Sequence, residues 1–549
     1  MSQRSYSTNP PRKRPKSRSR LAPLLALFAI LAVLGGGVLA VAVWWPSAAF
    51  RTDPQALAGI KIAPDGEKVT AVTVRDESGH RIPVRNRGGR IFPTGKLASG
   101  ERLEIDATVR RAAWIGWLVG HGTQIHETVT TPEAKVSATL LHLHENDPVV
   151  VTFNHPASVV VLRLPGFPVD HLSFQRPRRR VDTGLRASGK SRFGIATVAV
   201  AARPWELLAP AVRVSWFPEG LHLQAVVKPA PGTTIDPGTK ITLTFSVPVK
   251  ALFGVTRPKL EPATPGSWLQ TAPNALTFRP SAGFGLGTHV SISLPSPTDV
   301  LAGGQTQTFT KLTWSVPGGS FTRLQQVLAQ LGYLPLQWHP AGSDVPATRL
   351  AQTEAAISPP SGTYTWRYSD TPSQLRSLWR PDAWTRMTQG AVMAFEHDQG
   401  LTVDGIAGPM VWRSLIAAAV NGATTSHSYS YVFVHRSVPQ NLTLWSDGKT
   451  IMNVKINTGV PAAPTPYGTH AVFEHIPIGT MRGQNPDGSH YVDPGIRWIS
   501  YFYGGEAIHG FNRATYGFPQ SVGCVEAPIA TAGQIWPYTT IGTLVSIIP

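Results

Sequence analysis

Most of the chain is built from short stretches in which apolar and polar residues alternate. The stretch ITLTFSV (residues 241–247) has Ile, Leu, Phe and Val at every second position with Thr or Ser between them, and residues 290–294 and 309–316 repeat the pattern. A period of two puts the apolar side chains on one face of a β-strand. Because Pro and Gly turns separate these runs, residues 226–316 are predicted to form a small β-sandwich.

Residues 46–225 show the same β-rich pattern, for example in KVTAVTVRD (residues 68–76), but contain no motif that indicates a role. Within this region His142, His144 and Glu145 could share one side of a strand and bind a metal ion. Two His at positions i and i+2 without further ligands are weak evidence for a metal site. We therefore predict a solvated strand face here.

The apolar period changes to that of a helix after the Pro-Gly-Gly sequence at residues 317–319. The first predicted helix has Ser320 as its N-cap and Gly332 as its stop. Its apolar face is formed by Phe321, Leu324, Leu328 and Leu331. An irregular insert rich in Pro, Ser and Trp is expected to follow over residues 335–384.

Two further helices are predicted after the insert. The first ends at Gly400, and the second starts at Pro409 after a turn at Asp404 and Gly405. Their inward faces are formed by Ala391, Val392, Phe395, Trp412, Leu415 and Ile416. With the first helix, they resemble the three-helix peptidoglycan-binding module of cell-wall enzymes over residues 318–420. A helical packing domain without a ligand is the alternative.

Length, composition and charge limit the possible classes of protein. A chain of 549 residues is too long for one hydrophobic core, and its 51 Gly and 49 Pro favour turns and short strands over long helices. The formal net charge is +18, of which the first twenty residues contribute +7, so +11 belongs to the rest. Such a surface attracts polyanions, either nucleic acid or an anionic cell envelope.

An uncharged apolar segment distinguishes between these two partners. Residues 21–45 carry no charged side chain, and a helix of this length can cross a bilayer core of ~30 Å. The basic tail at residues 1–20 predicts a cytoplasmic N-terminus. A signal peptide cleaved near the small residues 46–49 is the alternative. In both cases the remainder lies outside the cytoplasm, so we expect a single-pass membrane protein at the cell wall and no nucleic-acid partner.

Cys524 is the only cysteine of the chain, so it cannot form an intrachain disulfide. His509 precedes it by 15 residues, after an apolar strand-like stretch. A nearby imidazole can lower the pKa of a thiol from ~8.5 and make the nucleophilic thiolate the major form. Gly523 lets the backbone approach a substrate, and a helix starting after Cys524 also favours a thiolate. These features indicate a nucleophile, with an inert buried cysteine as the alternative.

Another candidate nucleophile is rejected because of its context. Ser446 and Lys449 match the Ser-x-x-Lys motif of serine penicillin-recognising enzymes, which opens a helix and is followed by partner motifs. Here Asp447 and Gly448 predict a hairpin turn between two strands, and no Lys-Thr-Gly motif follows.

Three motifs occur in order near the C-terminus. They are Thr-Pro-Tyr-Gly at residues 465–468, His-Gly at residues 509–510 and Ser-Val-Gly-Cys at residues 521–524. With these motifs and the final stretch GTLVSII (residues 542–548), residues 428–549 resemble the catalytic domain of the L,D-transpeptidases (YkuD-like family). The resemblance implies a β-rich fold and acyl transfer in two steps.

The resemblance also implies the roles of individual residues. Cys524 is the implied nucleophile and His509 the group that activates it. Support for the substrate and for the oxyanion is implied for Ser521, Gly523, Gly510 and Tyr467. Neither a metal nor a cofactor is required.

In the reaction that the resemblance implies, the thiol attacks the amide after the third, L-centred residue of a peptidoglycan tetrapeptide. D-alanine leaves, a thioester forms, and the side-chain amine of a second stem peptide gives a 3–3 cross-link. Water as the acceptor would give an L,D-carboxypeptidase, and transfer to a protein amine is a further alternative. A non-catalytic peptidoglycan-binding scaffold is the alternative from another class.

Two positions depart from the pattern of the family. Most relatives have His where Val522 stands, and most have Arg where Glu526 stands. Valine cannot exchange a proton, so the role of the base falls to His509 alone. A carboxylate of Glu526 near the sulfur would raise the pKa of the thiol.

The sequence thus predicts a multidomain, mainly β protein that is attached to the membrane and acts on peptidoglycan stem peptides. The region over residues 226–316 resembles, by pattern alone, an immunoglobulin-like spacer. The predicted parts are a basic tail (1–20), a transmembrane helix (21–45), a β-rich region of unknown role (46–225), the spacer (226–316), the helical module with its insert (318–420) and the catalytic domain (428–549).

Overall fold

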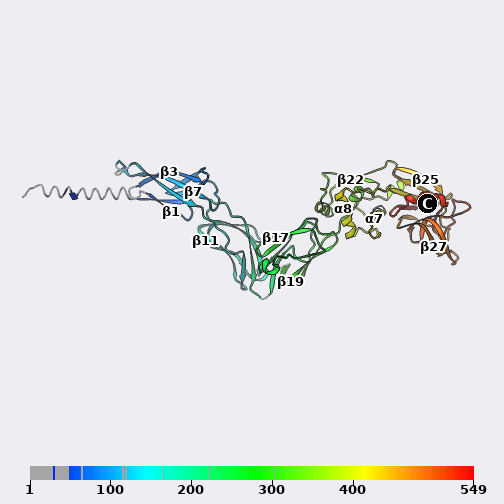
Figure 1. The fold of residues 1–549 in the computed structure, drawn as a ribbon, viewed down its shortest axis with the longest axis horizontal. Helices are drawn as coiled ribbons and strands as arrows, with labels where there is room; N and C mark the ends of the chain where they lie inside the picture. Colours follow the sequence, from blue (N-terminus) through cyan, green and yellow to red (C-terminus); the bar gives the residue numbers. More distant parts are fainter. Residues whose placement is uncertain are drawn as a thin grey trace, which may run out of the picture. The chain divides into compact units, whose positions relative to one another are not determined.

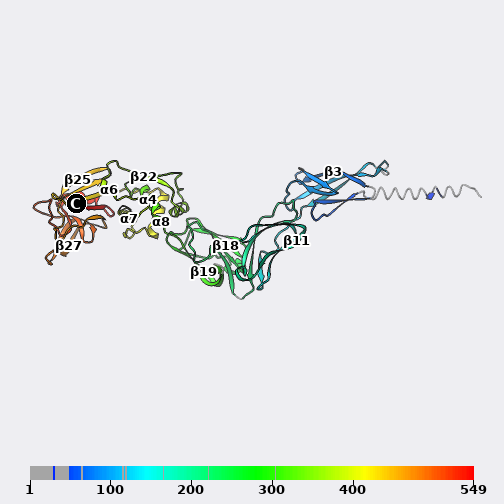
Figure 2. The ribbon, with the colours of Figure 1, turned by 180° about the vertical axis from the view of Figure 1, so that it is seen from behind.

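The chain folds into several domains made mainly of β-strands, with few helices, as predicted. The computed structural model describes residues 27, 29, 30, 48–63, 66–113, 116, 117, 120–164, 166–220, 222–302 and 305–549. Two compact units follow each other along the sequence, Met1–Glu219 and Gly220–Pro549, coloured blue to cyan and green to red in Figures 1 and 2. The predicted domain boundaries stay predictions.

The predicted basic tail (1–20) and transmembrane helix (21–45) lie outside the described residues, apart from Leu27, Ala29 and Ile30. Within the described part of the chain, no helix has the length and apolar character needed to cross a membrane.

The described residues of the first unit form three sheets, with strand orders β1-β2-β6-β5, β4-β3-β7-β8 and β11-β10-β12-β13-β9. Strand β7 shows why they form: its alternate residues Leu103, Ile105, Ala107 and Val109 are buried, as a period of two requires. The strands are β1 (Ala48–Arg51), β2 (Ala58–Ile62), β3 (Gly66–Asp76), β4 (Arg81–Ile82), β5 (Val84–Arg87), β6 (Arg90–Pro93), β7 (Arg102–Arg111), β8 (Gly122–Thr130), β9 (Leu140–Leu143), β10 (Pro148–Arg163), β11 (Asp170–Arg186), β12 (Gly194–Ala201) and β13 (Val212–Pro218).

The histidines considered for a metal site lie at the end of β9. His142 and His144 are both exposed, and Nδ1 of His144 is 3.4 Å from Oε2 of Glu219. Among the described residues, no group of three His, Cys, Asp or Glu side chains is arranged to hold a metal ion.

The second unit begins with seven strands joined by hydrogen bonds into one sheet. The long strand β19 pairs with β16, β14 and β20, and apolar residues of these strands form a single core. The immunoglobulin-like assignment of this region stays a prediction. The elements are β14 (Leu223–Lys228), β15 (Ile241–Phe245), α3 (Val249–Phe253), β16 (Leu260–Glu261), β17 (Gly266–Ala272), β18 (Ala275–Pro280), β19 (His289–Ala302) and β20 (Gln305–Ser315).

The predicted helices follow as α4 (Phe321–Gln330), α7 (Arg386–Asp398) and α8 (Pro409–Asn421). Ser320 caps α4 by accepting a hydrogen bond from the backbone N–H of Arg323, as its position predicts. The predicted inward side chains are buried except Phe321, which is 49% exposed. Phe321 is the first residue of α4 and its ring packs on Trp384 at the surface, so the buried part of the predicted apolar face begins at Leu324.

The insert between α4 and α7 is more regular than the sequence indicated. It contains a hairpin of β21 (Leu336–Pro340) and β22 (Gly362–Trp366), together with helices α5 (Arg349–Ile357) and α6 (Ser373–Ser377). Thr348 caps α5 through a hydrogen bond from Ala351 N–H. The expectation of an irregular insert was therefore wrong, because its frequent Pro and Ser residues mark turns between short elements.

The C-terminal part contains two sheets with orders β25-β24-β23-β31-β26 and β27-β28-β29-β30. Its elements are β23 (Ser430–His435), β24 (Asn441–Ser446), β25 (Lys449–Lys455), β26 (Gly468–Ala471), β27 (Glu474–Gln484), β28 (His490–Tyr503), β29 (Glu506–Gly510), β30 (Val525–Ala527), α9 (Ile529–Ile535) and β31 (Leu544–Ile548). The hairpin predicted at Asp447 and Gly448 is present: both have positive φ, and Ser446 pairs with Lys449. The Ser-x-x-Lys motif therefore does not open a helix.

The helical region and the C-terminal sheets share one hydrophobic core. Tyr431, Trp445 and Leu544 belong to the same buried cluster as residues of α4, α7 and α8. Helix α7 lies close to the loop before β31, since a methyl group added to Gly390 would be 2.5 Å from the carbonyl oxygen of Gly542. The two parts are thus packed together, and α7 and α8 appear beside each other in Figure 1.

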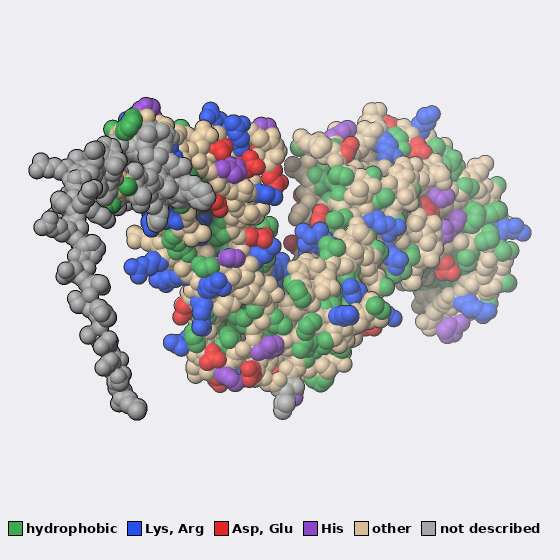
Figure 3. Space-filling view, turned by 60° about the vertical axis from the view of Figure 1, so that its left-hand side comes forward, with side chains coloured by type: hydrophobic (Ala, Val, Ile, Leu, Met, Phe, Trp, Pro, Cys, Tyr) green, Lys and Arg blue, Asp and Glu red, His purple; other side chains and the backbone are tan. Residues whose placement is uncertain are grey.

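Charged side chains are scattered over the face of the molecule that Figure 3 draws. On the face drawn in Figure 3, Lys and Arg side chains alternate with acidic, apolar and uncharged groups and do not gather in one stripe.

Candidate active site

His509 and Cys524 come together through the pairing of two short parallel strands. In β29 and β30, His509 is opposite Glu526 and Ile508 is opposite Val525. Cys524 directly precedes β30, and alternate residues of a strand point to the same side. Cys524, Glu526 and His509 therefore share one side of the sheet, although 15 residues separate the thiol from the imidazole in the sequence.

Cys524 is covered by apolar side chains. Its relative exposure is 8%, and it belongs to a buried cluster with Met481, Ile496, Ile499 and Ala507. Sγ points towards the carbonyl oxygen of Gly505 at 3.9 Å. The thiol is thus held beneath the hairpin of β27 and β28.

His509 is held as a neutral imidazole. Its exposure is 4%, and burial lowers its pKa. The contact of Nδ1 with the carbonyl oxygen of Gly510, at 3.3 Å, fits a proton on Nδ1, which leaves Nε2 as the acceptor. No hydrogen bond joins the imidazole to the thiol in this structure. A neutral ring with a free acceptor nitrogen is suited to taking a proton.

The thiol is neutral as well. Burial raises the pKa of Cys524 to about 12; a backbone hydrogen bond with Ala507 lowers it, and the carboxylates of Glu526 and Glu506 raise it further. Loss of water around the thiol therefore sets the direction of its pKa in the free protein, and the role of His509 in activating the thiol stays a prediction.

This arrangement predicts an unusual pH dependence for alkylation of Cys524. Because the raised pKa favours the thiol, reaction with iodoacetamide at pH 8 should be roughly tenfold or more slower than in the unfolded chain. The rate should continue to rise through pH 10, where an ordinary thiol has reached its plateau. Intact mass gives the rate directly, since the chain has one cysteine. A plateau near neutral pH would show that the thiol is activated in the free protein.

The loop that carries the thiol is fixed by buried hydrogen bonds. Ser521 Oγ donates to the carbonyl oxygen of Cys524 at 2.6 Å. Thr465 Oγ1 donates to the carbonyl oxygen of Gly523 at 2.7 Å and accepts from Gly459 N–H at 2.9 Å. Gly523 has a φ of +107°, which favours glycine. Ser521 and Thr465 thus hold the backbone rather than the thiol group.

The two remaining predicted residues, Gly510 and Tyr467, contact groups other than the thiol. A methyl group on Gly510 would be 3.0 Å from Cα of Ile529, so this glycine allows α9 to pack on β29. Tyr467 is 58% exposed and its ring faces Arg436 at 4.3 Å. Neither a hydrogen bond nor a ring contact joins Tyr467 to Cys524 or His509. Its role in binding substrate stays a prediction.

Glu526, the acidic residue that departs from the family pattern, has an ion-pair partner that the sequence did not reveal. Glu526 is 4% exposed and forms two hydrogen bonds of 2.8 Å with Arg513, to Nε and Nη2. Arg513 also donates to the carbonyl oxygen of Gln520 at 3.2 Å. The guanidinium group thus lies beside β30 although it comes from the loop after His509. The only signal in the sequence was one basic residue thirteen positions before the unexpected acid.

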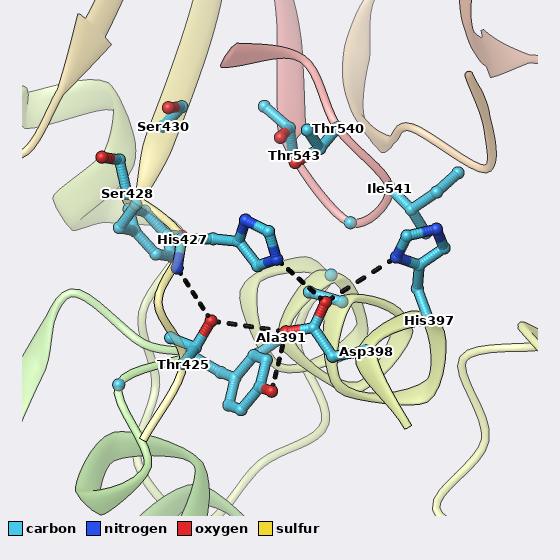
Figure 4. A pocket seen from close by; sticks show the side chains of 16 residues that line it. Ala391, His397, Asp398, Thr425, His427, Ser428, Ser430, Thr540, Ile541 and Thr543 are labelled. Atoms are coloured by element: carbon cyan, nitrogen blue, oxygen red, sulfur yellow. Dashed lines mark hydrogen bonds and ion pairs between the residues drawn. The ribbon is translucent and has the colours of Figure 1, made fainter. Parts of the chain in front are cut away.

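A cavity of about 90 Å³ lies between α7 and the C-terminal sheets, away from these residues. Figure 4 shows Asp398 at its centre, facing His427, His397 and Thr425. Asp398 accepts hydrogen bonds from Tyr333 at 2.8 Å and from Thr425 at 3.3 Å, and His427 Nε2 is 3.3 Å away. The carboxylate of Asp398 therefore already has hydrogen-bond partners. Through these contacts the cluster connects helix α7 to the linker before β23.

Comparison with known proteins identifies two regions. Residues 429–547 match the family model YkuD, the L,D-transpeptidase catalytic domain, and residues 381–415 match PG_binding_1, a peptidoglycan binding domain. No curated protein matches the chain.

Solved structures similar to this chain are L,D-transpeptidases. One from Mycobacterium smegmatis is 11% identical with a TM-score of 0.20, covering 60% of this chain and all of that one. The E. faecium catalytic domain is 24% identical with a TM-score of 0.21, covering 23% of this chain and all of that one. The family models show that the chain contains a YkuD L,D-transpeptidase catalytic domain preceded by a peptidoglycan-binding domain.

Proposed function

We propose that the protein forms 3–3 cross-links in peptidoglycan through a thioester on Cys524. The observation that carries this proposal is the position of a neutral His509 and a neutral Cys524 on one side of β29 and β30, within the matched catalytic domain. No other cysteine is available in the chain.

In the first step Nε2 of His509 accepts the proton of Sγ as the sulfur attacks the amide carbonyl after the third residue of a tetrapeptide stem. The imidazolium returns this proton to the leaving amine, and D-alanine departs. In our proposal, backbone N–H groups around Gly523 stabilise the oxyanion. In the second step the side-chain amine of another stem attacks the thioester, the C–S bond breaks, and the thiol is restored.

The other parts of the chain serve this reaction in our proposal. The helical module (318–420) holds peptidoglycan, which the match over residues 381–415 supports. The β-rich regions (46–225 and 226–316) carry the catalytic domain away from the membrane. The uncharged segment 21–45 anchors the protein, with a cytoplasmic N-terminus and the catalytic domain at the cell wall.

A non-catalytic scaffold is the second candidate, because the buried thiol with its raised pKa is a poor nucleophile in the free protein. The two candidates differ in whether covalent chemistry occurs at Cys524.

Intact mass spectrometry of the full chain in detergent with a disaccharide-tetrapeptide tests the proposal. An acyl adduct that is absent in Cys524→Ala, with accumulation of a dimer shortened by D-alanine, is the expected result. An adduct that resolves only to tripeptide would indicate a carboxypeptidase. If no adduct forms while peptidoglycan is still bound, the scaffold is correct.

A further inference from the structure

A second carboxylate lies beside the loop that carries the thiol. Glu506 is the first residue of β29, and it follows the turn at Gly504 and Gly505 that joins β28 to β29. The carbonyl oxygen of Gly505 is the group that Sγ of Cys524 faces. Glu506 is therefore next to the residue that contacts the nucleophile.

The side chain of Glu506 extends towards Gly523. A methyl group placed on Gly523 would be 3.1 Å from Cγ and 3.3 Å from Oε1 of Glu506. The carboxylate of Glu506 thus lies against the backbone of Gly523, directly before Cys524. It lies on the side where a residue other than glycine would have its side chain. It also acts on Cys524 and Tyr491, whose pKa values are raised mainly by burial and further by the charge of Glu506.

Glu506 forms neither a hydrogen bond through its carboxylate nor an ion pair within the described part of the chain. Glu526, on the same sheet, differs because Arg513 neutralises it. Glu506 is only half-buried, so a molecule that enters the site can reach it. A single unpaired carboxylate beside a nucleophilic sulfur opposes ionisation of the thiol. It would favour the binding of a positive charge at that place.

We propose that Glu506 binds the primary ammonium group of the acceptor stem peptide and thereby favours an amine over water in the second step. This inference rests on the proposed function. An ammonium group supplies three hydrogen-bond donors and a full charge, and charge-assisted hydrogen bonds to a carboxylate are about twice as strong as neutral ones. Water carries no charge and gains little from Glu506.

The carboxylate also provides a path for the proton that the acceptor must lose. Glu506 takes one proton from the ammonium, and the free amine nitrogen forms a C–N bond with the thioester carbonyl. The C–S bond breaks, and the second proton of the nitrogen passes through His509 to the sulfur. The products are the cross-linked amide and the thiol, and Glu506 releases its proton to water.

Glu506→Gln tests this role because it removes the charge and keeps the shape. The full chain is incubated with disaccharide-tetrapeptide, and the adduct on Cys524, the dimer and the tripeptide are measured. We expect the rate of adduct formation to be unchanged or higher. The ratio of dimer to tripeptide should fall about tenfold, through a higher KM for the acceptor.

Hydroxylamine and a matched variant separate charge recognition from damage to the site. Hydroxylamine is uncharged at neutral pH, so its reaction with the thioester should be equally fast in the wild type and in Glu506→Gln. Glu474→Gln, at an exposed position of β27, should keep the wild-type ratio. Glu506→Ala should lower the ratio as Glu506→Gln does, which provides a second variant if one of them folds poorly.

The outcomes distinguish this inference from the proposed function. A wild-type adduct together with an unchanged dimer-to-tripeptide ratio in both Glu506 variants would overturn the role of Glu506 alone. An equal fall in reaction with hydroxylamine and with the stem amine would also overturn it. Absence of any adduct on the wild-type protein would overturn both proposals.

Discussion

Replacement of Arg513 by alanine is expected to lower the free energy of unfolding by about 3–5 kcal/mol. The reason is the carboxylate of Glu526, which is 4% exposed and would lose both of its 2.8 Å hydrogen bonds. The contact of Arg513 with Gln520 would be lost as well. Denaturant unfolding of the full chain, followed by a probe of the catalytic domain, measures the difference.

Two further substitutions help to interpret the fall in the free energy of unfolding that is expected for Arg513→Ala. Arg482→Ala removes an exposed guanidinium from β27 and should change stability by less than about 0.5 kcal/mol. Glu526→Arg, which restores the residue usual in the family, should also be destabilising here because it would face Arg513. If Arg513→Ala costs less than about 1 kcal/mol, water compensates for the lost guanidinium and the pair is not a structural element.

Loss of the thiol is expected to have the largest effect on activity. Cys524→Ala should reduce cross-linking by roughly 10⁴-fold or more, since removing a nucleophile eliminates the covalent route. His509→Gln should reduce it by about 10²–10⁴-fold, because the proton of a thiol with a raised pKa then has no acceptor. Chromatography of the dimeric product gives both rates.

The double variant shows whether the two residues act as a unit. If they do, Cys524→Ala with His509→Gln should be no slower than Cys524→Ala alone. Circular dichroism controls for folding, and both variants should unfold as the wild type does. Additive losses would mean that His509 affects activity through the structure and not through the thiol.

The local patterns in the sequence were sufficient for much of the fold. Alternation predicted β15 and the strands around it, and Ser320 predicted the start of α4. The pair Asp447 and Gly448 predicted a hairpin, since both residues tolerate positive φ. Each of these features is encoded by residues that are close together in the sequence. The same is true within each of the three motifs that resemble the family.

Other features depend on residues that only the folded chain brings together. The partner of Glu526 comes from a loop, the insert forms elements of its own, and Phe321 packs on Trp384 at the surface. The raised pKa of Cys524 follows from burial by residues that are distant in the sequence, such as Met481 and Ile496. The sequence thus specified which groups are present and where strands and helices start. Long-range packing set their exposure and partners, and with them the pKa values on which the chemistry depends.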